Sequence, residues 1–285
     1  MYGRWYHFGM SIVTKGDGST EEFDPAKLER SLRHAGADES MARDIASHLV
    51  GEIEDGMSTD VIYKHAFKLL RKDERVIAAR YSMRRAILDL GPTGFPFEEF
   101  FSEVMRAKGY TTTTQVMVKG RCVEHEVDVV LEKEDRTIGA ELKFHNTPGY
   151  KTDLKTTLYV RARYWDIEWG AKDRKEKAGI DEGWLVTNTK FTSVAIEYAE
   201  CAGITLLGWN YPRGHGLADL IQETGVYPIT VLTGLSGAEK KRLMQEGVTL
   251  CRMISERPDV LSRAGISPKK IESIIAESRA VCGVV

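Results

Sequence analysis

The spacing of hydrophobic residues predicts that the first third of the chain is mostly helical. Residues 12–23 (IVTKGDGSTEEF) have the pattern of two short strands around an Asp-Gly turn, and Asp24-Pro25 supplies an N-cap with Pro at the first helical position. Apolar positions at helical intervals then predict helices over 25–36, 39–54, 59–72 and 74–90. The segment GPTGFP (91–96) is the strongest break in the chain, and we place a domain boundary there.

Beyond this break the pattern changes to alternating helices and strands. A helix is predicted over 97–109, and period-two alternation predicts strands near 112–119, 123–132 and 137–144. A helix over 152–168, a strand at 183–188, a helix over 192–202 and a strand at 204–209 follow. This order indicates an α/β domain with a mixed sheet.

From about residue 213 no strand pattern is convincing, and short helices with Gly turns predict a small helical domain. The expected fold class is therefore α/β, with a helical N-terminal domain, a central mixed sheet with flanking helices and a small helical C-terminal domain. We set the domain limits at 10–91, 92–212 and 213–285.

Composition changes this picture little. The chain has 285 residues, of which 42% are hydrophobic, enough for at least one substantial core. No apolar run is long enough for a membrane span, and the start does not have the pattern of a secretory signal, so we expect a cytoplasmic protein. The four cysteines are far apart in sequence and predict buried or incidental thiols.

Charge is more informative locally than globally. The net charge of −2 by itself argues against a nonspecific polyanion binder. A basic stripe nevertheless follows the acidic cluster of the predicted hairpin, and Asp153 is the one acidic residue within it. The stripe consists of Lys143, Lys151, Lys155, Arg161 and Arg163. This arrangement suits a metal site facing a phosphate backbone, although a solvated helix face explains such a stripe equally well.

The candidate chemistry lies in the hairpin HEVDVVLEKEDRTIGAELKFH (125–145). If the turn is 133–136, residues directly opposite each other sum to 269, so Asp128 faces Glu141 and Glu126 faces Lys143 on one side. The other side is wholly apolar and is expected to be core. Two facing carboxylates are destabilising unless something positive sits between them.

A divalent cation is the natural candidate for that charge. Mg²⁺ prefers a few carboxylate oxygens and keeps water ligands, so Asp128 and Glu141 are predicted to hold Mg²⁺ or Mn²⁺. Lys143 would then point at the attacking water or at the developing charge on phosphate oxygens. His125 and His145 flank the site and are more often structural partners than bases.

Asp128 followed by Glu141-Leu142-Lys143 resembles the signature of PD-(D/E)xK nucleases. GFPFEEFFSEVMRAKGY with HEVDVV and ELKFH resembles the Mrr-like restriction endonucleases over roughly residues 92–210. The resemblance implies a metal-dependent DNA endonuclease and adds Glu98 of the first helix to the site. The helix after ExK offers Lys155, Tyr159 and Arg161 without a clear match to the family's further site residue.

Residues 12–90 resemble an ATP cone, through VTKGDGSTEEFDPAKL, DGMSTDVIY and AARYSMRRAI. The resemblance implies that ATP or dATP binds as an effector, with Lys15, Glu21, Lys27 and Thr59 as contacts. Lys15 on the strand pair and Lys27 on the helix can aim two ammonium groups at one triphosphate. No GxxxxGK[ST] motif is present, so ATP is not expected to drive a motor.

The last segment resembles paired helix-hairpin-helix modules, with turns at Gly247-Val248 and Gly265-Ile266 followed by Lys269 and Lys270. DNA binding and a simple packing or dimer element are equally good interpretations. The leading hypothesis for the chain is a Mg²⁺-dependent endonuclease that acts on DNA under nucleotide control, and a homo-oligomer is compatible with it. The alternatives are a catalytically inactive nucleotide-regulated DNA-binding protein and an assembly protein.

Overall fold

A computed structural model describes residues 11–91, 94–147, 149–175 and 179–282. The chain divides between Ser82 and Met83 into two compact units, which are described separately. No helix among the described residues combines the length and apolar character needed to cross a membrane.

The first unit is a strand pair followed by helices. Val13, buried at the centre of the pair, lies opposite Glu21. The Asp24 side chain accepts the Ala26 N–H and caps the first helix, which begins at Pro25 as predicted. The elements are β1 (Ile12–Thr14), β2 (Thr20–Glu22), α1 (Pro25–His34), α2 (Glu39–Val50), α3 (Thr59–Asp73) and α4 (Arg75–Tyr81).

The prediction of one helix over 74–90 is wrong, because the structure has two helices there. α4 ends at Tyr81, and α5 (Met83–Leu88) begins after Ser82. The Ser82 hydroxyl donates to the Ala79 carbonyl at 2.8 Å, a side-chain bond that competes with continuation of the helix. Ser82 is also where the two compact units divide, whereas we had placed the boundary at 91–96. Residues 92 and 93 lie outside the described part.

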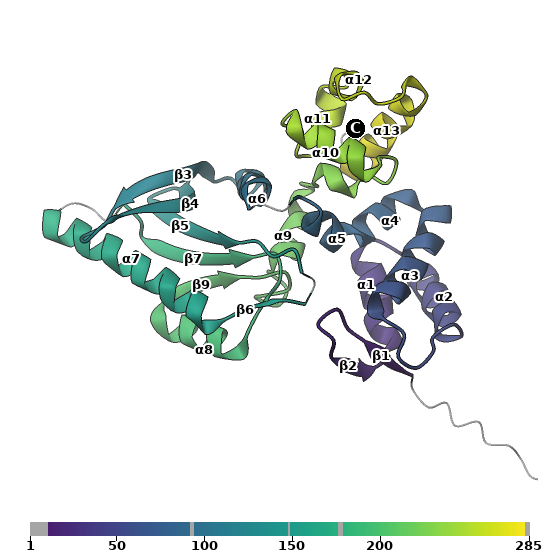
Figure 1. Ribbon diagram of the computed structural model, residues 1–285, viewed down its shortest axis with the longest axis horizontal. Coiled ribbons are helices and arrows are strands. Elements are labelled where there is room, and N and C mark those ends of the chain that lie inside the picture. Colours follow the sequence, from purple (N-terminus) through teal and green to yellow (C-terminus); the bar gives the residue numbers. More distant parts are fainter. Residues whose placement is uncertain (1–10, 92–93, 148, 176–178, 283–285) are drawn as a thin grey trace, which may run out of the picture. The chain divides into compact units, whose positions relative to one another are not determined.

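The second unit is built on a five-stranded mixed sheet in the order β3-β4-β5-β7-β9 (Figure 1). The first three strands are antiparallel, and β7 and β9 run parallel to β5. Helix α6 packs against β3 and β4, while α7 and α8 pack side by side. The elements are α6 (Phe95–Ala107), β3 (Thr111–Lys119), β4 (Glu124–Lys133), β5 (Arg136–Lys143), α7 (Leu154–Arg174), β7 (Glu182–Thr187), α8 (Ser193–Ala202), β9 (Ile204–Leu207) and α9 (Leu217–Thr224).

Two short strands were not predicted, β6 (Lys151–Thr152) and β8 (Lys190–Phe191), which pair in parallel. Each is only two residues long, too short to show an alternating pattern. The Thr192 N–H also donates to the Thr152 carbonyl. This small pairing ties the loop that follows β5 to the start of α8.

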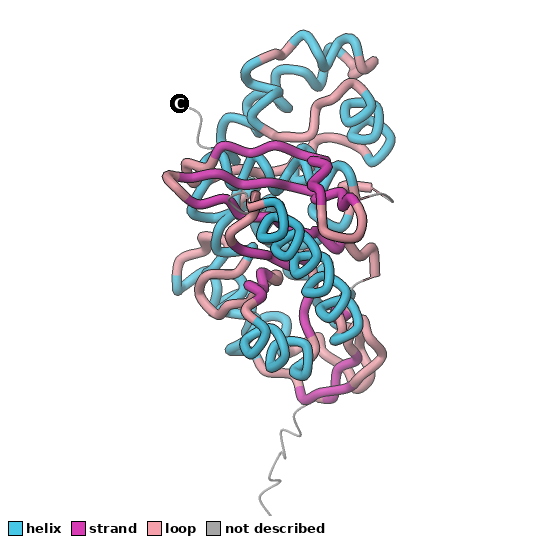
Figure 2. Tube along the Cα trace, turned by 90° about the vertical axis from the view of Figure 1, so that its left-hand side faces the viewer, coloured by secondary structure: helices cyan, strands magenta, loops and turns pink. Residues whose placement is uncertain are grey.

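Two glycines of the sheet make room for a side chain of helix α7. Gly139 on β5 and Gly183 on β7 are direct partners in the parallel ladder. A Cβ built on Gly183 would lie 2.4 Å from the Tyr164 ring, and one on Gly139 would lie 2.8 Å from it. The two glycines therefore form a slot that holds the buried Tyr164 ring of α7, and burial raises the pKa of Tyr164. Figure 2 shows the long α7 helix running diagonally in front of the strands.

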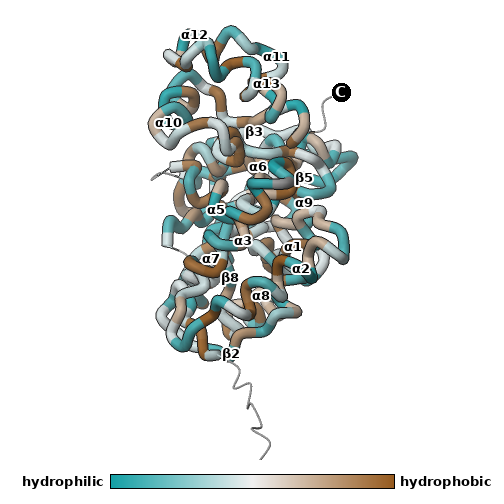
Figure 3. Tube along the Cα trace, turned by 90° about the vertical axis from the view of Figure 1, so that its right-hand side faces the viewer, coloured by the Kyte–Doolittle hydropathy of each residue, from teal (hydrophilic) through white to brown (hydrophobic). Residues whose placement is uncertain are grey.

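The C-terminal region is helical in its described residues, as expected. Gly247 and Gly265 are both left-handed, and each is followed by a buried residue whose N–H donates to a leucine carbonyl five residues earlier. The two predicted turns thus have the same local geometry, which is that of a helix C-cap. Figure 3 shows hydrophobic and hydrophilic stretches alternating along these helices. The elements are η1 (Ile229–Val231), α10 (Gly237–Gln245), α11 (Arg252–Glu256), α12 (Asp259–Arg263) and α13 (Pro268–Cys282).

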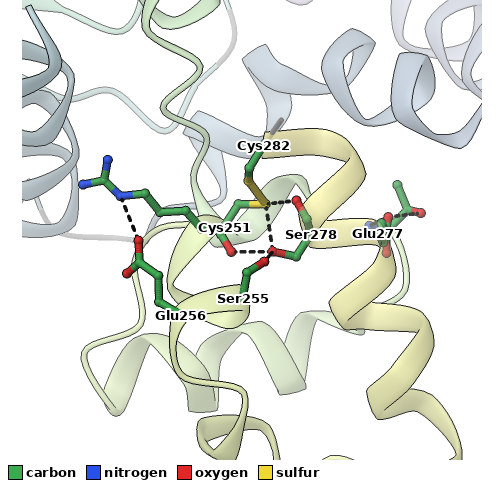
Figure 4. Close-up of a disulfide and its surroundings, with 8 residues drawn as sticks. Cys251, Ser255, Glu256, Glu277, Ser278 and Cys282 are labelled. Carbon is green, nitrogen blue, oxygen red and sulfur yellow. Dashed lines mark hydrogen bonds and ion pairs between the residues drawn. A yellow bond between two sulfur atoms is a disulfide. The ribbon is translucent and has the colours of Figure 1, made fainter. Parts of the chain in front are cut away.

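The expectation of four unpaired thiols is wrong for two cysteines. Cys251 and Cys282 form a disulfide between the start of α11 and the end of α13 (Figure 4). The Cys251 carbonyl also accepts the buried Ser278 hydroxyl at 2.8 Å. A separation of 31 residues conceals this contact in the sequence. Cys122 and Cys201 are free and exposed.

Gly183→Ala tests the slot. We expect a loss of about 1–3 kcal/mol of unfolding free energy, because the new methyl group would displace the Tyr164 ring. Gly237→Ala is the matched control, since a Cβ there meets nothing within 4 Å. Denaturant unfolding of the full chain measures both. Equal stability of the two variants would contradict the slot.

Candidate active site

The predicted hairpin register is confirmed along the ladder, which runs from Lys133 opposite Arg136 to Val129 opposite Ala140. Every one of these pairs sums to 269. The ladder stops one step before Asp128 and Glu141, so these two residues are not a ladder pair. Instead, the Leu142 N–H donates to the Asp128 carboxylate at 2.7 Å. The site therefore lies where the two strands separate, with the Asp128 side chain accepting an N–H that the ladder would otherwise use.

Glu141 is the buried charge of the site, only 2% exposed. The Lys143 ammonium contacts one of its carboxylate oxygens at 2.6 Å, and the Arg163 guanidinium contacts the other. Our expectation that Lys143 faces Glu126 is therefore wrong. The expectation that only a bound ion can relieve the carboxylates also needs correction, since two cationic side chains of this chain already do so.

Arg163 is the site residue that the sequence did not reveal. It lies on α7, and one nitrogen contacts both Glu141 and the Glu126 carbonyl, the latter at 2.8 Å. Its other terminal nitrogen donates to the Tyr159 hydroxyl, and its guanidinium lies 5.0 Å from the centre of the Tyr159 ring. Burial, the largest single effect, lowers the pKa of Arg163, but Glu141, Tyr159 and Asp128 together outweigh it, so the pKa rises. Arg163 thus bridges β4 and β5 where their ladder has ended.

Two further carboxyls share this electrostatic environment. Burial, followed by repulsion from Glu141, raises the pKa of Asp128 to about 6. Glu98, in the first turn of α6, has its pKa raised to about 7 by burial and by the charges of Asp128, Glu126 and Glu141. The structure therefore brings Glu98 to the group formed by Asp128, Glu141 and Lys143.

The two flanking histidines are held by structural hydrogen bonds. His125 contacts the Asp166 carboxylate of α7 at 2.8 Å, which lowers the pKa of Asp166 well below its usual range. The His145 ring contacts the Thr152 hydroxyl, and its backbone N–H and carbonyl both bond to the Asn188 side chain. Burial and then Lys143 lower the pKa of His145.

Three of the four predicted nucleotide contacts lie together in the first unit. The Glu21 carboxylate contacts the Lys15 ammonium at 2.8 Å and the Lys27 ammonium at 3.0 Å, and these bonds lower the pKa of Glu21. Thr59 is the first residue of α3. The bridge between Thr14 and Ser58 brings that helix start to the end of β1, next to Lys15 in sequence.

The carboxylates of the site suit a hard divalent ion that takes only a few of its ligands from the protein. Within the described ranges, no three His, Cys, Asp or Glu side chains form a metal-binding group. Asp128 and Glu141 remain a pair of oxygen donors. Mg²⁺ is commonly bound through one or two carboxylates and completes its shell with water and phosphate oxygens, so the pair fits this ion.

The raised pKa values predict a pH-dependent stability. Between about pH 4 and pH 7 the folded protein holds the Asp128 and Glu98 protons more tightly than the unfolded chain does, so stability falls as pH rises through this window. We expect Glu98→Gln and Asp128→Asn to stabilise the chain at pH 8 by on the order of 1 kcal/mol, after allowance for solvent screening, and to have little effect at pH 4. Thermal unfolding with a chelator at both pH values measures this. Glu132→Gln, an exposed carboxylate on the same strand, controls for loss of one charge. Stabilisation of equal size at both pH values would show that the raised pKa values of Asp128 and Glu98 are not its cause.

Comparison with known proteins divides the chain near residue 90, at the break expected from the sequence, rather than at Ser82. The ATP cone domain model matches residues 11–89, the Mrr restriction endonuclease model residues 92–220, and the AF1548-like C-terminal model residues 227–282. An uncharacterized protein of Archaeoglobus fulgidus is 39% identical over 183 residues, 64% of this chain and 99% of that protein.

Two solved structures are also similar. The crystal structure of AF1548, a protein of unknown function, is 35% identical with a TM-score of 0.54, over 68% of this chain and all of that one. MspJI restriction endonuclease in complex with a 27-mer oligonucleotide is 13% identical with a TM-score of 0.32, over 83% of this chain and 47% of that one. The chain belongs to the AF1548-like family, and it carries an ATP cone domain followed by an Mrr-like restriction endonuclease domain.

Proposed function

We propose that this protein is a metal-dependent DNA endonuclease whose activity responds to ATP or dATP bound by the cone. The observation that carries the proposal is the burial of Glu141 between Lys143 and Arg163, beside Asp128, within a restriction endonuclease domain. A packed domain has little reason to bury this carboxylate next to a second one, since each costs desolvation energy.

Asp128 and Glu141 are the proposed metal ligands, for Mg²⁺ or Mn²⁺. When bound, such an ion supplies positive charge to a phosphodiester and acidifies a water molecule. The side chains of the site supply the other contacts to the phosphate. Lys143, whose side chain is 35% exposed, can leave Glu141 and donate to a phosphate oxygen as negative charge develops there.

Glu98 and Arg163 are assigned supporting roles. A carboxyl with a pKa of about 7 can accept or release a proton near neutral pH, so Glu98 is suited to take a proton from water or return one to a leaving oxygen. Arg163 holds the Glu141 carboxylate and the Glu126 carbonyl together. It fixes the distance between β4 and β5 and is proposed to act by positioning.

The cone is proposed to bind the triphosphate through Lys15 and Lys27, with Glu21 and Thr59 as further contacts. Glu21 holds both ammonium groups at one point, which favours their approach to a single polyanion. Exposed Lys151 and Lys155, near the nuclease site in sequence, are candidate contacts to the DNA backbone.

The competing function is a nucleotide-regulated DNA-binding or assembly protein without catalysis. Its support is that Lys143 and Arg163 already contact both oxygens of the Glu141 carboxylate, so positive charge reaches Glu141 without an ion. Salt-dependent DNA binding without cleavage would favour it.

Asp128→Asn and Lys143→Ala distinguish the two functions. We expect each to reduce cleavage of supercoiled plasmid in Mg²⁺ or Mn²⁺ by at least about 100-fold, because Asp128→Asn removes a proposed metal ligand and Lys143→Ala removes a positive charge that acts on the reacting phosphate. Folding is checked by circular dichroism, and Glu132→Gln on the same strand should cleave as the unchanged protein does. Cleavage by the Asn and Ala variants at the control rate would refute the proposed site.

Lys15→Ala and Lys27→Ala test the nucleotide site. Each removes a charge-assisted contact, so we expect ATP affinity to fall by about tenfold or more in each variant. Isothermal titration with ATP and with dATP measures the affinity. Lys64→Ala is the control, since Lys64 lies on α3 and pairs with Asp60. Unchanged ATP affinity in both variants would show that Lys15 and Lys27 do not contact the nucleotide.

A further inference from the structure

The outward face of α7 is unusually apolar. Leu158 is 44% exposed, Trp165 39% and Trp169 46%. The opposite side of the same helix is buried in the domain core, through Val160, Tyr164 and Ile167. Large side chains at this exposure on one helix face form a contiguous patch that is typical of an interaction surface.

The spacing of these residues is that of a helix-pairing seam. Leu158, the exposed Ala162, Trp165 and Trp169 are separated by four, three and four residues, which places them in one line along α7. The next positions in the same line are Lys155 and Lys172. The apolar part of the seam is therefore about three helical turns long and has charged ends.

The seam is already ordered within one chain. The Trp165 and Trp169 rings stack with their planes 5° apart and their centres 6.1 Å apart. The Arg161 guanidinium lies over the Trp165 ring, 4.8 Å from its centre. Ordered aromatic side chains lose little conformational entropy when a partner covers them.

We propose that a second copy of this chain packs on this face, with the two α7 helices antiparallel about a twofold axis. Such an axis between Ala162 and Trp165 places Ala162 against Trp165 of the second copy, and Leu158 against its Trp169. Ala162 and Leu158 then each face a tryptophan of the second copy, so no two tryptophans meet directly. A twofold contact of this kind closes after two copies.

The flanking charges favour the same partner in the same orientation. Arg161 and Glu168 lie on one side of the seam, seven residues apart. In the antiparallel arrangement each Arg161 lies opposite Glu168 of the second copy, and the pair occurs twice. A nucleic acid is less well matched, because Glu168 and the acidic Asp173 also line this helix and Lys172 is already paired with Glu168 at 2.7 Å.

The inference does not rest on the proposed endonuclease activity. If that activity is present, two copies would carry two sites, the number required to cut both strands of a duplex. If it is absent, the seam still associates.

Charge reversal tests the contact in the full chain. Without nucleotide, we expect sedimentation velocity over a concentration series to show a reversible dimer. Arg161→Glu and Glu168→Arg should each weaken it by about tenfold or more, because each places like charges opposite one another twice. The double variant R161E/E168R should restore at least half of the lost affinity, since the opposite pairs are rebuilt. Trp169→Gln should abolish the dimer, whereas Val194→Ser, which removes an exposed hydrophobic side chain from α8, should leave it unchanged.

Several results would overturn the inference. They are a monomer at every soluble concentration, a dimer unaffected by Trp169→Gln, or a double variant as weak as Arg161→Glu alone. Loss of binding to a duplex oligonucleotide in Trp169→Gln, with unchanged sedimentation, would assign the face to nucleic acid instead. Catalytic variants such as Lys143→Ala should dimerise normally, so failure of the endonuclease proposal can be told from failure of this one.

Discussion

The restriction endonuclease domain depends on how it accommodates the Glu141 carboxylate, which is almost completely removed from water. Burying an unpaired carboxylate costs on the order of several kcal/mol, and a neighbouring Asp128 adds repulsion to this cost. Lys143 compensates from the same strand and Arg163 from the following helix. The sheet and α7 must therefore both be in place before the carboxylate is stable, so the site and the fold of this domain form together.

The second requirement is close approach of α7 to the sheet, and it is met by removing side chains. Gly139 and Gly183 face each other on adjacent strands and leave room for the Tyr164 ring. Successive residues of a helix point about 100° apart, so a helix anchored at Tyr164 has the orientation of Arg163 fixed as well. The aromatic anchor Tyr164 and the cation Arg163 are thus adjacent in sequence, and the position of the first sets the position of the second.

Local patterns predicted the elements and the hairpin register well, because register follows from period-two alternation and the length of one turn. Val130 opposite Gly139 is a direct consequence of that rule. The rule could not show where the ladder ends, since the separation of the strands depends on Asp128 accepting the Leu142 N–H and on Arg163 entering the gap.

Arg163, the helix break at Ser82 and the Cys251–Cys282 pair were missed for the same reason. Each depends on a contact or a packing boundary that spacing along the chain does not encode. A usable signal did exist for α7. Glycine in the interior of a predicted strand, as at Gly139, marks a close approach by another element. The helix that approaches it was already predicted, and its basic residues were the candidates to reach the carboxylates.

Helix α7 carries different tasks on its different sides, and this limits how the helix can vary. Tyr164 fills the slot, Arg163 reaches the carboxylates and Asp166 accepts from His125 and from the backbone of the β3–β4 loop. Only the line from Leu158 to Trp169 is left without a task inside the domain, yet it is the side on which polar residues would cost nothing. Two exposed tryptophans at such positions lower solubility. The other sides of the helix are fixed by packing, so a partner that covers this face would contact a rigid element. The outward face is therefore best explained by a contact outside the domain, and any such contact bears on the same rigid element that holds Arg163 against Glu141.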